Sequence, residues 1–234
     1  MTNSISMRTA AWVAGLSLFL PTAPYAEFYV FGKLIIYDNA AQTSQNLLHN
    51  PKLFLSVIFA MLFTFIYDIV LAWALYIFLR PVNARLALLG AWFRIVYAVL
   101  AIVALYNFVY AYQLVNMPGF QEAFRNQQVL QLVNARRLAM DLAFIVFGIY
   151  LILGGILMYK ASYIPKLMGV LMMLAGPAWI ILSLQRYFFK EYDLSWLMFF
   201  SIGEVVFGIW LLIKGTRIKE SEIVAHREPM TNNY

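Results

Sequence analysis

Long apolar runs dominate the chain, and short polar breaks separate them. An α-helix crosses the bilayer core, about 30 Å thick, with about 20 predominantly apolar residues. Six runs reach that length: Ala10–Val30, Leu53–Leu79, Leu86–Tyr112, Leu138–Tyr159, Ile164–Gln185 and Leu194–Lys214. Proline lacks the amide N–H that continues a helix, and Pro81 and Pro165 stand in two of the breaks. The pattern predicts an all-α bundle of six transmembrane helices, formed as a single domain over residues 1–214.

The first run also has features of a secretory signal peptide. Arg8 precedes a short apolar stretch, and Ala23-Pro24-Tyr25-Ala26 resembles a cleavage site. However, Pro24 would stand three residues before the cut, where a small residue is usual, and the apolar run continues to Phe31. We therefore expect a retained helix with a tolerated kink at Pro21.

Two of the polar segments between the expected spans are long. In Gly32–Pro51, Asp38 is a suitable N-cap for a short helix. The segment Gln113–Arg137 contains a Met117-Pro118-Gly119 turn and then a Gln-rich run with spaced apolar residues. Both segments are compatible with short amphipathic helices lying on the membrane as lids, or with plain surface connectors. The polar tail, residues 215–234, is predicted to be disordered.

Basic residues set the expected orientation, because they are enriched in short cytoplasmic loops. With the N-terminus inside, the inner side carries Arg8, Arg80, Arg85, Lys160, Lys166, Lys214, Arg217, Lys219 and Arg227. The outer side carries Lys33, Lys52, Arg125, Arg136, Arg137, Arg186 and Lys190. The inner loops are also the shorter ones. We therefore expect both termini in the cytoplasm.

Composition excludes several functional classes. The chain of 234 residues is 63% hydrophobic and 12% charged, with no Cys and only two His residues. These values exclude a disulfide scaffold, a Cys-based metal site and thiol catalysis. The net charge of +6 comes mostly from loops that meet lipid headgroups, so nucleic-acid binding is rejected. We expect membrane lipids as partners, and no metal or cofactor.

Five ionisable residues fall inside the expected spans, where an unpaired charge is costly and usually functional. They are Glu27, Asp68, Arg94, Asp141 and Glu204. Glu27 and Asp141 lie near outer helix ends, within reach of water. The other three lie deeper. From a rise of 1.5 Å per residue, Asp68, Arg94 and Glu204 are about 16, 12 and 15 Å from the inner helix ends.

The shared depth predicts one charge cluster of Asp68, Arg94 and Glu204, with at least one carboxylate within about 4 Å of the guanidinium. Small residues on the Arg94 face of its helix let another helix approach closely. Tyr67 and Ser201 are secondary candidates beside Asp68 and Glu204. Gly176-Pro177 is expected to break the backbone hydrogen-bond ladder of the fifth span near mid-membrane and to free a carbonyl.

The charge cluster supports several functions. It could bind or move a small polar solute, an ion or a proton, with Arg94 as the anchor for an anionic ligand. It could instead fix helix packing in a structural or regulatory partner protein. The runner-up is an intramembrane enzyme acting on a lipid-like substrate, although no nucleophile motif or metal-binding constellation is present, and the structural protein ranks third. We favour the non-enzymatic binding or transport function.

Four stretches in order resemble the bacterial family known as domain of unknown function 4386. The most specific is Leu79-Arg80-Pro81-Val82-Asn83, followed by Leu86-Ala87-Leu88-Leu89 and Phe93-Arg94. The others are Gly32-Lys33-Leu34 with Asp38–Thr43, Tyr163-Ile164-Pro165 with Gly169-Val170-Leu171, and Gly203-Glu204 with Trp210-Leu211-Leu212. The resemblance implies a multi-span protein of the bacterial inner membrane with a retained first helix, and places Arg94 and Glu204 at motif positions. It implies no substrate.

Overall fold

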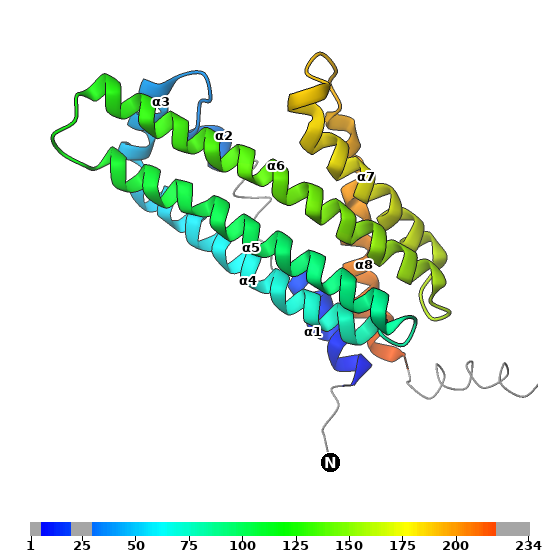
Figure 1. Cartoon of the computed structure of the whole chain (residues 1–234). Coiled ribbons are helices and arrows are strands. Elements are labelled where there is room, and N and C mark those ends of the chain that lie inside the picture. Colours follow the sequence, from blue (N-terminus) through cyan, green and yellow to red (C-terminus); the bar gives the residue numbers. More distant parts are fainter. Residues whose placement is uncertain (1–5, 20–29, 219–234) are drawn as a thin grey trace, which may run out of the picture. The chain divides into compact units, whose positions relative to one another are not determined.

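The computed structural model describes residues 6–19 and 30–218, and all regular structure in these residues is helical (Figure 1). Contacts divide the chain into two compact units. Unit 1 comprises Met1–Phe19, Asp68–Val96 and Phe144–Tyr234, and unit 2 comprises Leu20–Tyr67 and Tyr97–Ala143. Three long helices contribute residues to both units: α4 (Pro51–Leu79), α5 (Ala84–Val115) and α6 (Glu122–Lys160).

Five helical segments are long and apolar enough to cross a membrane. They are α4 with 29 residues, α5 with 32, α6 with 39, α7 (Lys166–Phe188) with 23, and the 23-residue segment Ser195–Arg217. The last consists of the 3₁₀ helix η2 (Ser195–Ser201), α8 (Ile202–Ile213) and the 3₁₀ helix η3 (Gly215–Arg217). Multi-pass membrane architecture, as predicted from the apolar runs, is therefore supported by the described helices.

The first expected span is described only in part. Helix α1 runs over Met7–Phe19, a length of about 20 Å at 1.5 Å per residue. Residues 20–29, which include Pro21 and Glu27, lie outside the described part of the chain. The count of six spans therefore stays a prediction.

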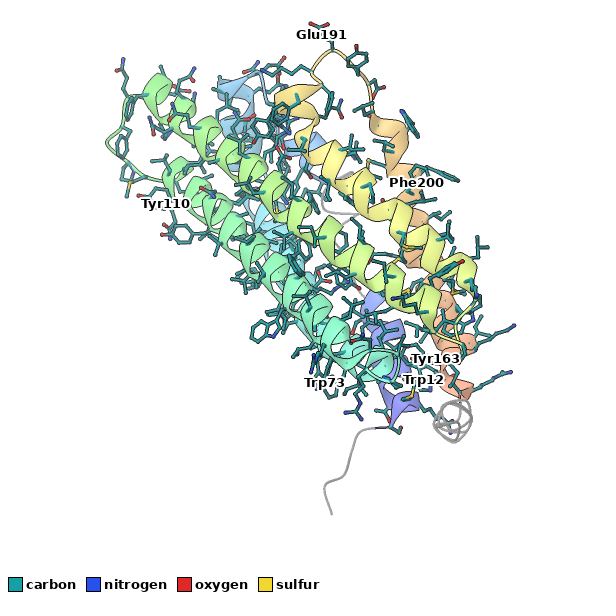
Figure 2. All side chains as sticks on the ribbon, turned by 45° about the vertical axis from the view of Figure 1, so that its right-hand side comes forward. Trp12, Trp73, Tyr110, Tyr163, Glu191 and Phe200 are labelled. Carbon is teal, nitrogen blue, oxygen red and sulfur yellow. The ribbon has the colours of Figure 1, made fainter. Side chains whose placement is uncertain are left out.

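Large apolar side chains cover the outer faces of the spanning helices. Phe63, Trp92 and Tyr106 are more than half exposed, and Trp73 and Tyr110 project from the ribbons in Figure 2. Exposure of such a surface to water would cost free energy, whereas contact with lipid tails would not. This distribution indicates that the helices contact lipid.

In unit 1, α1 packs antiparallel against α8. A Cβ atom at Gly15 would lie 2.7 Å from the Leu212 side chain, and one at Gly208 would lie 3.2 Å from the Leu18 Cβ. Ala11 meets Gly215 farther along the same pair. The helices approach closely because glycine occupies these contact positions. The start of α1 and the end of α8 therefore lie at the same end of unit 1.

Helices α6 and α7 touch through two pairs of glycines. A Cβ at Gly148 would lie 2.6 Å from the Gly176 carbonyl oxygen, and one at Gly155 would lie 2.8 Å from that of Gly169. Both pairs are seven residues apart on antiparallel helices, so the contact extends over two turns. Unit 1 thus contains a backbone-to-backbone helix pair that the apolar pattern did not reveal.

The expected interruption at Gly176-Pro177 affects one hydrogen bond and not the course of the helix, because Pro177 has no N–H to donate. Helix α7 is continuous from Lys166 to Phe188 with Pro177 inside it. A proline within a span is tolerated where surrounding structure supports the helix. Gly176 contacts α6 at this point, so the glycine also serves close packing.

Unit 2 contains the short helices α2 (Gly32–Leu34) and α3 (Ala40–His49) before α4. The N-cap of α3 is Asn39, whose side chain accepts a hydrogen bond from the Gln42 N–H, and the expectation of Asp38 in that role is wrong by one residue. The Thr43 hydroxyl accepts from the Ile36 N–H and donates to the Ile36 carbonyl, which closes the preceding turn onto α3. A helix therefore forms in the first long loop.

The second long loop does not form a separate helix. Helix α6 begins at Glu122 and continues without a break to Lys160, whereas the apolar pattern placed its start at Leu138. No proline or glycine interrupts Glu122–Leu138, so the helix propagates from the turn at Gly119, the described residue with positive φ. The Gln-rich run is thus the first part of α6.

The short connections between the helices of unit 1 lie at one end of the unit. The Tyr163 hydroxyl donates to the Phe78 carbonyl at 2.7 Å, which joins the α6–α7 turn to the end of α4. The Phe78 ring contacts Trp210 of α8 at 6.4 Å between centroids. Beyond α8, η3 orders residues 215–217, which were expected to be disordered, and residues 219–234 lie outside the described part.

Candidate functional site

Arg94 lies on the buried face of α5 in unit 1 and is only 4% exposed. Ala87, Ala91 and Ala98 lie on the same face and are buried as well. These methyl side chains leave room for neighbouring helices to approach the long arginine side chain. Arg94 thereby reaches partners on three other helices.

Asp68 of α4 is the principal acidic partner of Arg94. The guanidinium donates from Nε to Asp68 Oδ1 at 3.0 Å, and Nη2 donates to the same oxygen. The Asp68 side chain is 11% exposed. Two donors on one carboxylate form a charge-assisted contact that fixes the guanidinium plane.

Glu204 of α8 is the second acidic partner. Arg94 Nη1 donates to Glu204 Oε1 at 3.4 Å, within ion-pair distance but longer than the contact of Nε with Asp68. The Glu204 side chain is 18% exposed. Its position near the start of α8 follows from the packing of Gly203, where a Cβ would lie 3.1 Å from Leu171 of α7. Glu204 is therefore held less tightly than Asp68.

Two aromatic rings of α6 complete the surroundings of Arg94. The guanidinium carbon lies 4.6 Å from the Tyr150 ring centroid and 5.5 Å from that of Phe147. Each cation–π contact contributes about 0.5–2 kcal/mol, more where water is excluded. Phe147 also contacts Trp179 of α7 at 5.9 Å. This aromatic wall was not singled out by sequence, because aromatic residues are frequent throughout the spans.

At this site the acidic groups outnumber the basic ones. One guanidinium faces two carboxylates, so the three groups carry one excess negative charge when all are ionised. Isolated charges are expensive in an apolar interior and are normally compensated. A bound proton or a small cation would supply the missing positive charge.

The secondary candidates lie elsewhere. Ser201 is half-buried in the last turn of η2, shortly before Glu204. Tyr67 and Asp141 belong to unit 2, where Tyr67 is exposed and Asp141 is half-buried. Glu27 lies outside the described residues. Unit 1 therefore brings together Asp68, Arg94 and Glu204, and adds Phe147 and Tyr150 to them.

Unit 2 contains a second buried arginine that sequence reasoning assigned to an outer loop. Arg136 of α6 is 3% exposed, and its guanidinium carbon lies 4.9 Å from the Phe108 ring centroid and 5.3 Å from that of Phe31. Its burial follows from the early start of α6, which places it on the buried face with Val129 and Val133. The helical spacing of these three residues was the signal that could have revealed it.

Within residues 6–19 and 30–218, no group of three or more His, Asp or Glu side chains is arranged to hold a metal ion. The ionisable groups that contact Arg94 are the carboxylates of Asp68 and Glu204 and the phenol ring of Tyr150.

Comparisons with known proteins find similarity to proteins without an assigned activity. The chain is 36% identical over 155 residues to an uncharacterized protein of Archaeoglobus fulgidus, covering 66% of this chain and 81% of that protein. No solved structure matches the chain. Residues 13–215 match the family described as "Domain of unknown function (DUF4386)". The match covers most of the chain, including Asp68, Arg94 and Glu204, and the chain belongs to this family.

Proposed function

We propose that this membrane protein binds a proton or a small monovalent cation at the charge cluster and moves it through the bundle. The observation that supports this most directly is the charge balance: two carboxylates share the single guanidinium of Arg94. Ionisable groups placed within spans often belong to ion pathways or proton relays.

An anionic ligand is a poorer fit to the same geometry. Three nitrogen atoms of Arg94 already donate to carboxylates, and two aromatic rings lie against the guanidinium. The two carboxylates already exceed the charge of the guanidinium, so an anion would add further negative charge to an apolar interior. A cation or proton instead reduces the excess negative charge.

Glu204 is the proposed site of exchange. It receives one hydrogen bond, at 3.4 Å, whereas Asp68 receives two, and its side chain is the more exposed of the two acids. The ionisable groups around it are Asp68 from α4, Arg94 from α5 and Tyr150 from α6. Asp68 would remain paired with Arg94 while Glu204 takes up and releases the ion.

We further propose a single bundle of six spans with both termini in the cytoplasm of a bacterial cell and the chain in its inner membrane. Several connections at one end of unit 1 carry basic residues, as cytoplasmic loops usually do. These residues are Arg8, Arg80, Arg85, Lys160, Lys166, Lys214 and Arg217. In this topology the end of α8 is its cytoplasmic end. Glu204 lies nine residues before that end, a distance of about 14 Å.

Ion movement can be measured in proteoliposomes that contain the purified protein and a trapped pH-sensitive dye. A pH gradient is imposed in the presence of Na⁺, K⁺ or a large impermeant cation. We expect wild type to dissipate the gradient and Glu204→Gln to lose most of this flux. Glu191→Gln, which removes an exposed acid from the α7–η2 loop (Figure 2), should behave like wild type.

The controls distinguish the remaining alternatives. Wild-type flux equal to that of empty liposomes would contradict transport and favour a structural function for the charge cluster. Stabilisation by a carboxylate or phosphate compound that depends on Arg94 would contradict the cation assignment.

A further inference from the structure

A cavity opens where α1 meets the end of α8 in unit 1. Its volume is about 610 Å³, and its wall is formed by side chains of α1, α8 and η3. The close antiparallel packing of α1 on α8 fixes this arrangement, because Gly15 and Gly208 bring the two helices together. The cavity therefore lies between the start of α1 and the end of α8, and η3 forms one of its walls.

The cavity has one charged side and one apolar side. Arg8 of α1 and Arg217 of η3 contribute two guanidinium groups, and the buried Thr216 hydroxyl beside them donates to the Leu212 carbonyl at 3.2 Å. Trp12 and Ile213 form the apolar part of the wall and are about half exposed. Of the described residues that line the cavity, none is acidic. Figure 2 shows Trp12 beside the end of α8.

We propose that this cavity binds the phosphate group of an anionic phospholipid, with the acyl chain against Trp12 and Ile213. The two guanidinium groups carry permanent positive charges that attract a phosphate group. Basic pockets between helices on the cytoplasmic side of membrane proteins suit anionic headgroups, and tryptophan favours the level of the headgroups. Lipid binding here does not depend on the chemistry at Arg94, and it would hold if the protein moved no ion.

A lipid fits the cavity better than a free anion does. A free phosphate would use the two arginines and leave Trp12 and Ile213 exposed to water. A phospholipid satisfies both sides of the cavity at once, since its headgroup carries the charge and its tail covers the apolar wall. The adjoining helices are also long and apolar enough to span a bilayer, so lipid is the molecule present at highest local concentration.

Native mass spectrometry of the detergent-solubilised protein tests the proposal. Phosphatidylglycerol is titrated against phosphatidylcholine with identical acyl chains, and inorganic phosphate is titrated separately. We expect wild type to prefer phosphatidylglycerol. The double variant Arg8→Gln/Arg217→Gln should bind it about 30-fold more weakly, as expected for two basic groups at a membrane surface, with little change for phosphatidylcholine.

A matched control removes the same charge from the same end of unit 1. Arg80 and Arg85 are exposed and do not line the cavity, so Arg80→Gln/Arg85→Gln should retain the preference for phosphatidylglycerol. The charge-preserving variant Arg8→Lys/Arg217→Lys should retain it as well, and serves if the glutamine variant does not fold.

Four results would overturn the proposal. They are equal binding of the two lipids by wild type, an equal loss in the control variant, loss of the preference in the lysine variant, and inorganic phosphate that competes fully with the lipid at matched concentration. The last result would make the cavity a site for free anions.

Discussion

Arg94 is enclosed by two carboxylates and two aromatic rings, so its removal leaves two buried acids without their cation. Breaking one side of a buried ion pair typically costs about 3–5 kcal/mol. We expect Arg94→Ala to lower the free energy of unfolding by that amount, measured by denaturant titration in mild detergent. Arg85→Ala, which truncates an exposed arginine of the same helix, should have little effect.

A double-mutant cycle separates coupling from independent damage. Asp68→Asn combined with Arg94→Ala should cost clearly less than the sum of the two single variants, because the neutral amide no longer needs a cation. Additive losses would show that Asp68 and Arg94 are not coupled.

Replacement of Glu204 should be milder than replacement of Arg94. The amide oxygen of Glu204→Gln can still accept a hydrogen bond from Arg94 Nη1, and the excess negative charge disappears. We expect a change in unfolding free energy of about 1 kcal/mol or less, measured under the same conditions. A loss as large as that of Arg94→Ala would mean that the Glu204 charge itself holds the helices together.

Asp193, in the loop before η2, provides a pH-dependent contact outside the spanning segments. Hydrogen bonds from the Ser195 hydroxyl and from its backbone N–H lower the pKa of Asp193 below its ordinary value of 3.8. A lowered pKa means that this contact stabilises the folded state above pH 3.8 and is lost as the pH falls through the lower folded value. Carboxyl-carbon NMR should therefore give a titration midpoint below 3.8.

The variant Ser195→Ala removes the hydroxyl and keeps the backbone N–H. It should move the Asp193 midpoint part of the way back toward 3.8. A wild-type midpoint at or above that value would contradict the contact.

At the scale of helices, the glycine pairs between α6 and α7 make a prediction with an internal control. A Cβ at Gly155 would lie 2.7 Å from the Met173 backbone nitrogen, whereas one at the adjacent Gly154 would meet nothing within 4 Å. Gly155→Ala should destabilise the protein by about 1–3 kcal/mol through overpacking. Gly154→Ala should be neutral or stabilising by about 0.5–1 kcal/mol, since alanine favours a helix more than glycine does.

Unfolding titrations of the two variants in detergent measure this difference. If both alanines had the same effect, the close approach of α6 and α7 at Gly155 and Gly169 would be wrong.

Helix boundaries show how far the apolar pattern predicts elements. The limits of α4, α5 and α7 lie within a few residues of the predicted ones, because prolines and polar residues end these apolar runs. The start of α6 was misplaced because its first part is amphipathic and polar on one side, which resembles a loop when only apolar length is counted. The error also hid the burial of Arg136.

The sequence pointed to only some of the residues around Arg94. Depth along each helix predicted Asp68, Arg94 and Glu204 as candidates, because charges in apolar runs are rare and easily recognised. Depth could not identify Phe147 and Tyr150, which lie against Arg94 through the packing of α6 rather than through any local pattern. The glycine contacts likewise depend on which helices are neighbours.

For the whole molecule, the proposed topology predicts which loops face the cytoplasm. The chain has no cysteine, so single cysteines can be introduced and labelled with a membrane-impermeant maleimide in intact cells and in inverted vesicles. Arg80→Cys and Ser162→Cys should react from the cytoplasmic side, and Met117→Cys and Glu191→Cys from the opposite side. Reaction of Arg80→Cys and Glu191→Cys from the same side would contradict the proposed topology, and a uniform reversal would place both termini outside.

The central claim is that the charge cluster takes up a proton or a small cation at Glu204. Infrared difference spectroscopy of the reconstituted protein tests it most directly, because protonated and ionised carboxyl groups absorb at different frequencies. As the pH is raised or Na⁺ or K⁺ is added, wild type should lose the signal of a protonated carboxyl group. Glu204→Gln should lack that change and Glu191→Gln should retain it. A wild-type spectrum in which both buried acids stay ionised at every pH and respond to no cation would contradict the claim.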